Sequence, residues 1–196
     1  MYAVNCATLY DGAVLQQVLP QLTADRAARV QQLRTPEKRA QRAAAGLLLR
    51  HLFGDATITS TENGKPYLPD CPQIHFNLSH TGAWVLCAVS DAPVGVDAQA
   101  LTHYRAKVAA RWFSEEERQW IAQQSDERFT RLWTRKEAYA KMTGDGMVSA
   151  VRGAPQLPHV TKEYDDLAGD GLYIAVCTGK ANTFAPAIEI IKEPLW

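Results

Sequence analysis

The order of helical and strand patterns along the chain constrains its fold more than any other feature. A weakly alternating N-terminal segment is followed by two helical segments and several apolar strands, and a similar order returns after the break at Ala92-Pro93. Because helices and strands are interspersed in both passes, we expect an α+β fold built from two similar α/β halves. The break places the N-terminal half at residues 1–92 and the C-terminal half at residues 93–196.

The N-terminal half is expected to hold two helices among its strands. Thr23 can cap a helix over Thr23–Leu33, and Thr35, followed by proline at the first helical position, begins a second helix that ends near Gly54. Alternating or β-branched apolar runs predict the strands. They are Tyr2–Leu9, Ala56–Ser60, Ile74–Ser79 and Trp84–Ser90, with His80-Thr81-Gly82 as the loop between the last two.

The C-terminal half begins with the short strand Val94–Ala98 and continues into three helical patterns. Ser114, with Glu117 three residues later, forms the capping-box pattern of a helix N-terminus. The polar segment Lys162–Gly171 is expected to be a loop. The helices are Tyr104–Phe113, Ser114–Gln124 and Asp126–Met142, and the final strands are Leu172–Thr178 and Ala187–Ile191.

Composition excludes several classes of protein. Hydrophobic residues make up 46% of the 196 residues, so a packed core is expected. Lysine and arginine together number 21, as do aspartate and glutamate, so no general basic field favours nucleic acid. No apolar run approaches the roughly 18 residues of a membrane span, and the four cysteines form no C-x-x-C pair. We expect a cytoplasmic protein that binds any anionic ligand through a local cluster.

The helical segment Arg131–Lys141 carries a carboxylate among cations. Glu137 and Lys141 are four residues apart and share a helix face, with Trp133 one turn earlier. Such a face can bind a metal ion and a phosphate together, or it can be an ordinary ion pair. Asp97, at the end of a short apolar strand, supplies a second carboxylate, unless it is a simple turn residue. Two carboxylates with substrate phosphate oxygens suit Mg²⁺.

Three further clusters can bind an anion. The segment Phe76–Gly82 is rich in hydrogen-bonding side chains, and Gly64-Lys65-Pro66 is a rigid cationic turn. Arg39 and Arg42 lie three residues apart on one helix face, next to Lys38, and an arginine fork matches phosphate oxygens. Taken singly, each cluster is equally compatible with a solvated loop, turn or helix face.

Together these clusters resemble the 4'-phosphopantetheinyl transferases of the surfactin-synthetase-activating type, over about residues 42–146. The resemblance rests on five motifs in one order at compact spacing. They are Gly64-Lys65-Pro66, Phe76–Gly82, Val94–Asp97, Phe113–Glu117 and Trp133–Lys141.

The resemblance implies a monomeric enzyme with two halves in pseudo-twofold arrangement and the active site at their interface. It implies transfer of the 4'-phosphopantetheine arm of coenzyme A to a serine of an apo acyl or peptidyl carrier protein. The reaction requires Mg²⁺ and releases adenosine 3',5'-bisphosphate. Fatty-acid, polyketide and nonribosomal-peptide carriers all fit.

The same resemblance implies roles for individual residues. Asp97 and Glu137 would bind Mg²⁺, Glu137 would act as general base toward the carrier serine, and Lys141 would contact the pyrophosphate. The remaining implied contacts are with coenzyme A. Arg42, Ser79 and His80 would bind its phosphates, and Lys136 would assist Lys141 at the pyrophosphate. Gly64, Lys65 and Pro66 would border the adenine and ribose. Lys38 and Arg39 are looser candidates for the 3'-phosphate.

One position departs from the family pattern, which often carries Asp-x-Glu where this chain has Asp97-Ala98-Gln99. Gln99 is thus a doubtful third metal ligand, and Gln99→Glu is predicted to lower the Mg²⁺ concentration needed for half-maximal rate. The neutral side chain also supports an alternative, a non-catalytic homologue that binds coenzyme A or a carrier protein. A magnesium-dependent nuclease or phosphatase is a further alternative that the neutral net charge disfavours.

A segment between the metal motifs is the expected docking surface for the carrier. Residues 103–113 are locally basic and aromatic, and carrier domains in such systems tend to present an acidic helix. The alternative is a structural helix in which Trp112 and Phe113 belong to the core and the cations are solvated.

Overall fold

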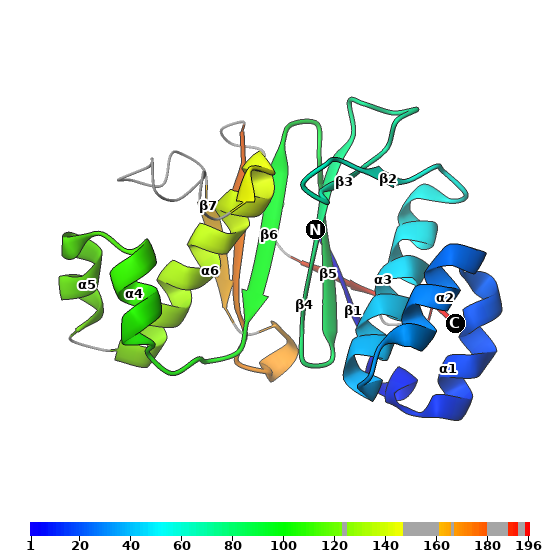
Figure 1. The fold of residues 1–196 in the computed structure, drawn as a ribbon, viewed down its shortest axis with the longest axis horizontal. Helices are drawn as coiled ribbons and strands as arrows, with labels where there is room; N and C mark the ends of the chain where they lie inside the picture. Colours follow the sequence, from blue (N-terminus) through cyan, green and yellow to red (C-terminus); the bar gives the residue numbers. More distant parts are fainter. Residues whose placement is uncertain (123–124, 147–160, 166, 180–187, 192–194) are drawn as a thin grey trace.

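Two β-sheets lie at the centre of the molecule, and helices cover their outer sides (Figure 1). The structure, a computed structural model, describes residues 1–122, 125–146, 161–165, 167–179, 188–191 and 195–196. Helices α1–α3 lie on one side and α4–α6 on the other. This arrangement confirms the predicted α+β class. Within these described ranges, the helices are too short or too polar to cross a membrane.

The first sheet has the strand order β4-β5-β1-β9. Strands β4 and β5 form an antiparallel hairpin, in which Ser79 pairs with Leu86 and His80 with Val85. Strand β1 is antiparallel to β5 and parallel to β9. These strands are β1 (Tyr2–Asn5), β4 (His75–Thr81), β5 (Trp84–Ser90) and β9 (Glu189–Ile191).

The second sheet has the order β6-β8-β7, and all its pairs are antiparallel. A separate two-stranded hairpin, β2-β3, stands apart from both sheets. Its turn holds Gly64 at φ 82°, a left-handed conformation that favours glycine. These strands are β2 (Thr59–Ser60), β3 (Pro66–Tyr67), β6 (Val94–Gln99), β7 (Thr161–Asp165) and β8 (Tyr173–Thr178).

The helix starts follow the predicted capping residues. The hydroxyls of Thr23 and Thr35 accept backbone N–H groups at the starts of α2 and α3, and Ser114 and Glu117 form the capping box of α5. The α-helices are α1 (Gly12–Val18), α2 (Ala24–Gln32), α3 (Pro36–Phe53), α4 (Ala106–Trp112), α5 (Glu115–Ile121) and α6 (Ser125–Thr143). Short 3₁₀ turns cover Ala7–Tyr10, Leu19–Gln21 and Leu167–Gly169.

Three main hydrophobic clusters hold these layers together. The first joins α1–α3 to one face of the first sheet, and the second lies between the sheets, where Trp84 and Leu86 meet Val96 and Ile174. The third packs α4 and α5 on α6 around Phe129. Cys6, Cys87 and Cys177 are buried, and burial raises the pKa of Cys6 to about 11 and that of Cys87 to about 12.

Side chains of β4 join the two halves by hydrogen bonding to the edge of β6. Asn77 Oδ1 accepts the backbone N–H of Val96 at 3.0 Å, and Ser79 Oγ accepts that of Ala98 at 3.2 Å. Both side chains are buried, at 6% and 3% exposure. Asn77 and Ser79 thus satisfy backbone donors that a further strand would otherwise pair, and they fix the spacing of the halves.

Several local predictions need correction. Lys162–Gly171 is not all loop, because β7 occupies its start, and His80 and Thr81 belong to β4 rather than to a loop. Asp97 lies within β6, as the predicted strand Val94–Ala98 has it, and the alternative of a turn residue is excluded. The boundary at 92/93 separates the two sheets, but β9 returns to the first sheet, and Leu195 and Trp196 pack on the first core. The pseudo-twofold relation stays a prediction.

Candidate active site between the two halves

A cleft of about 1220 Å³ separates the N-terminal helices from α6. Its walls come from α2, α3, the β2-β3 hairpin, strand β4 and the C-terminal part of α6. Several predicted residues line it together. They are Arg42, Gly64, Lys65, Pro66, Ser79, His80, Glu137 and Lys141.

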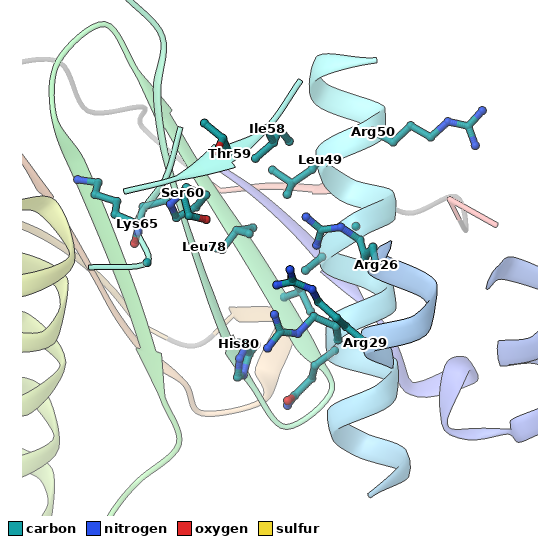
Figure 2. Close-up of a pocket in the computed structure, with 18 of the residues that line it drawn as sticks. Arg26, Arg29, Leu49, Arg50, Ile58, Thr59, Ser60, Lys65, Leu78 and His80 are labelled. Carbon is teal, nitrogen blue, oxygen red and sulfur yellow. The ribbon is translucent and has the colours of Figure 1, made fainter. Parts of the chain in front are cut away.

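Three arginines form the helical wall of this cleft. Arg26 and Arg29 of α2 join Arg42 of α3, and Figure 2 shows Arg26 and Arg29 directed toward the strand that carries His80, whereas Arg50 points away. Burial lowers the pKa of Arg26, and the neighbouring Arg42 and Arg29 lower it further. Three guanidinium groups held together in this way favour a ligand with several negative charges.

Sequence reasoning found Arg42 and missed Arg26 and Arg29. The sequence contained the pattern that would have identified them. Arg26 and Arg29 are three residues apart, which is the helical spacing that singled out Arg39 and Arg42. Arg39 is instead turned away, and its Nε donates to the Leu33 carbonyl at 2.7 Å. Neither Arg39 nor Lys38 lines the cleft.

The wall opposite the arginines belongs to β4. His80 lies there, where partial burial lowers its pKa and the cations Lys141 and Arg42 lower it further. A neutral imidazole at this place can both donate and accept a hydrogen bond. An arriving phosphate would favour its protonated form, because the anion offsets the surrounding cations.

Asp97 lies behind the floor of the cleft, 2% exposed, and is surrounded by hydrogen-bond donors. Lys141 Nζ lies 2.6 Å from its Oδ1, and Ser79 Oγ donates to the same oxygen at 3.0 Å. The Gln99 amide donates to Oδ2 at 3.0 Å. The predicted Lys141 cation therefore pairs with Asp97 across the two elements β6 and α6.

Glu137 lines the cleft one helical turn before Lys141. Burial raises its pKa, and the negative charge of Asp97 raises it further, while Lys141 and Arg105 oppose the shift. Asp97 and Glu137 are therefore close enough for their negative charges to repel each other, and a cation between them would relieve that repulsion.

The turn at Gly64-Lys65-Pro66 borders the cleft, but the Lys65 ammonium is directed toward the second half. It donates to the carbonyl of Met142, at the end of α6, and lies 3.4 Å from that of Val94. Figure 2 shows this side chain extending away from the arginines. The ammonium thus ties the β2-β3 hairpin to α6, and burial lowers its pKa.

Lys136 is a predicted phosphate contact that does not line the cleft. Its side chain is 3% exposed, pairs with Glu117 at 2.9 Å and lies 5.4 Å from the centre of the Phe113 ring. The predicted phosphate contact for Lys136 is wrong, because its charge is used to hold α5 against α6.

The docking segment at residues 103–113 shows both predicted features. Phe113 belongs to the cluster between α4, α5 and α6, and Trp112 packs against it. Arg105 and Lys107 are exposed, and Arg105 is near enough to Glu137 to lower its pKa. Arg105 therefore lies near the carboxylate end of the cleft.

The donor set at this end fits Mg²⁺. Asp97 and Glu137 offer hard oxygen ligands, and Mg²⁺ takes one or two carboxylates with substrate phosphates and water. In the part of the chain that the structure describes, no group of three or more His, Cys, Asp or Glu side chains converges on one point. A cation held here by described residues would therefore use two protein carboxylates at most.

The fold and cleft define a two-half α+β protein with an arginine-lined cleft beside the carboxylates Asp97 and Glu137. A family model described as the 4'-phosphopantetheinyl transferase superfamily matches residues 93–177. The transferase psf-1 of Bacillus pumilus is 42% identical over 52% of this chain and 48% of its own length, and Sfp of Bacillus subtilis strain 168 is 38% identical over 47% and 43%. The chain thus matches less than half the length of these relatives.

A relative from Salmonella typhimurium is matched over more of its length. The 4'-phosphopantetheinyl transferase AcpT of strain LT2 is 30% identical over 71% of this chain and 76% of its own length. The chain therefore belongs to the 4'-phosphopantetheinyl transferase superfamily.

Proposed function

We propose that this protein transfers the 4'-phosphopantetheine arm of coenzyme A to a serine of an apo carrier protein. The observation that carries the proposal is the cleft lined by three arginines and by Glu137, with the second carboxylate, Asp97, behind its floor. Coenzyme A has charged phosphates along its length, and such a cleft suits one ligand with both a phosphate cluster and a metal-binding pyrophosphate. The names of the relatives support the same reaction.

Different cations of the cleft would contact different phosphate groups of coenzyme A. Arg26, Arg29 and Arg42 offer charge-assisted hydrogen bonds to phosphate oxygens at the helical wall, and His80 faces them from β4. An ammonium has three N–H donors, and Lys141 uses two of them on Asp97 and Ser79. Its third donor remains for a pyrophosphate oxygen.

Asp97 and Glu137 would hold the metal. Mg²⁺, when bound, would neutralise negative charge that builds on the pyrophosphate during transfer. Glu137 has the further role of accepting the proton from the carrier serine. Glu137 lines the cleft in which the substrate would bind, as a general base must.

The proposal extends to the setting in which the enzyme works. We propose a cytoplasmic enzyme that works as a monomer, and the monomer is supported by both walls of the cleft coming from one chain. A non-catalytic homologue that binds coenzyme A or a carrier protein is the second candidate. The neutral Gln99 beside Asp97 favours it, because one negative charge is missing from the metal site.

A mass measurement separates these candidates. The protein is incubated with apo carrier proteins, coenzyme A and Mg²⁺, and transfer adds the mass of one phosphopantetheine group to a carrier. Glu137→Gln is expected to reduce the rate by about 10²–10⁴, the usual contribution of a general base. Glu116→Gln, an exposed glutamate on α5, is the matched control and is expected to keep the rate. Failure of every carrier, with coenzyme A still bound, would favour the non-catalytic homologue.

A further inference from the structure

The two oxygens of Asp97 differ in how many acceptor sites they have left. Each carboxylate oxygen can accept about two hydrogen bonds. Among the described residues, Oδ1 accepts from Ser79 Oγ at 3.0 Å and from Lys141 Nζ at 2.6 Å, whereas Oδ2 accepts only from Gln99 Nε2 at 3.0 Å. Oδ1 is therefore saturated, and Oδ2 retains one acceptor site.

The Ser79 hydroxyl is saturated as well. A hydroxyl donates one hydrogen bond and accepts two. Ser79 donates to Asp97 Oδ1, accepts from the backbone N–H of Ala98 at 3.2 Å and accepts from Lys141 Nζ at 3.2 Å. Its side chain is 3% exposed, so these three bonds use its whole capacity at the floor of the cleft.

We propose that Ser79 and Gln99 are positioning residues, which hold the Asp97 carboxylate so that Oδ2 alone is available to a metal ion. This inference rests on the proposed magnesium site. Ser79 acts from β4 of the first half, and Gln99 acts from β6 of the second. The orientation of Asp97 therefore depends on the junction of the halves, and neither residue contacts the ligand itself.

Ser79 and Gln99 thus act on Asp97 and not on the ligand or the metal. Ser79 was expected at a coenzyme A phosphate, but its hydroxyl has no hydrogen-bonding capacity left for one. Gln99 was considered as a third metal ligand, but its amide N–H is directed at the carboxylate that would bind the metal. For Ser79, a direct phosphate contact predicts a loss of coenzyme A affinity, whereas a positioning role predicts a loss of metal affinity.

Metal binding can be measured without the reaction. Mn²⁺ serves as the probe for the magnesium site, and free Mn²⁺ is followed by electron paramagnetic resonance with no coenzyme A or carrier present. Ser79→Ala and Gln99→Met, which remove the donors, are each expected to weaken Mn²⁺ binding by about tenfold or more, as loss of a ligand's supporting hydrogen bond typically does. Ser90→Ala is the matched control, since its hydroxyl also accepts a backbone N–H, from Ala92, outside the cleft.

Coenzyme A binding in EDTA gives the second readout, by titration calorimetry. Both variants are expected to bind coenzyme A within about twofold of the unmodified protein, because the phosphate contacts are untouched. A tenfold loss for Ser79→Ala in EDTA would overturn the proposal and restore the direct phosphate contact. Unchanged Mn²⁺ affinity in both variants would also overturn it.

Two outcomes keep the inference separate from the proposed function. If the unmodified protein binds no Mn²⁺, the metal site fails, and the positioning roles fail with it. If it binds Mn²⁺ but both variants bind equally well, only the positioning roles fail. If Ser79→Ala does not fold, the Mn²⁺ affinity of Gln99→Met tests the positioning role, because Gln99 is only half-buried and its replacement should be tolerated.

Discussion

At the scale of single residues, the arginine wall depends on a glycine. A Cβ atom on Gly46 of α3 would lie 2.4 Å from Arg26 Cδ and 2.7 Å from Leu22 Cδ2. Both contacts are with side chains, so the helix can accept alanine if Arg26 moves. Gly46 therefore gives the Arg26 side chain its path across α3 into the cleft.

Removing Arg26 should weaken coenzyme A binding. We expect Arg26→Met to raise the Kd by about tenfold or more, because a hydrogen bond to a charged group contributes about 1.5–3 kcal/mol. Gly46→Ala should act in the same direction by displacing the same side chain. Titration calorimetry in EDTA measures both.

Arg34→Met is the control, since Arg34 is exposed and does not line the cleft. The double variant Arg26→Met/Gly46→Ala should bind about as weakly as Arg26→Met alone, since both changes remove one contact. Fully additive losses would show that Gly46 acts by another route.

A carboxylate at position 99 should alter stability in a metal-dependent way. Gln99→Glu replaces the donor to Asp97 Oδ2 with a second negative charge, so we expect a loss of about 1–3 kcal/mol in the free energy of unfolding in EDTA. Mg²⁺ should then raise the melting temperature of this variant more than that of the unmodified protein. Equal melting temperatures in EDTA would contradict the hydrogen bond.

At the scale of elements, the fit of β6 against α6 sets the position of both carboxylates. A Cβ atom on Gly95 would lie 2.1 Å from the Ala138 carbonyl oxygen and 2.3 Å from the Met142 nitrogen. These are backbone atoms, which cannot give way as a side chain does. The absence of a side chain at Gly95 therefore lets the strand with Asp97 approach the helix with Glu137.

Gly95→Ala should accordingly destabilise the protein. We expect a loss of about 3 kcal/mol or more in the free energy of unfolding, because the backbones must separate. Urea unfolding followed by circular dichroism measures the loss. Gly12→Ala is the control: a Cβ atom at Gly12 would have no described neighbour within 4 Å, and alanine suits the first turn of α1, so stability should be kept or slightly increased.

Local signals predicted the elements where capping residues and apolar periodicity agreed. Thr35 with Pro36 located the start of α3, and the Ser114 capping box located α5. Helix α1 was missed, since its Asp11 cap precedes a short segment with glycine and little periodicity. Strand β7 was missed because Thr161–Asp165 is largely polar, and its pairing with β8 is a tertiary effect.

At the scale of the whole molecule, the sequence singled out candidate site residues but not the junction between the two halves. Asp97, Glu137 and Lys141 were found from motifs, whereas the bonds from Asn77 and Ser79 to β6 join segments about 20 residues apart. Residue spacing cannot show that two sheets meet edge to edge. The predicted phosphate contact of Lys136 was wrong for a similar reason. Its ion-pair partner Glu117 lies on another helix, which residue spacing does not reveal.

The exposed cations of α4 are expected to meet the carrier protein. Lys107→Glu should raise the KM for an acidic carrier about tenfold and leave the KM for coenzyme A unchanged, because it reverses a charge outside the cleft. Lys107 is a cleaner probe than Arg105, which also lowers the pKa of Glu137, so that reversal at Arg105 would change the chemistry as well. Steady-state rates at low and high salt measure the effect, which should shrink as salt screens the charges.

Lys38→Glu provides the matched charge reversal, on an exposed lysine of α3 that does not line the cleft. A general effect of net charge would raise the KM for carrier equally in both variants. A docking surface on α4 predicts a rise for Lys107→Glu alone, because the carrier serine must reach Glu137, and α4 packs on the helix that carries Glu137. Equal changes in the KM values for carrier and coenzyme A would place Lys107 outside the docking surface and leave the cleft assignments intact.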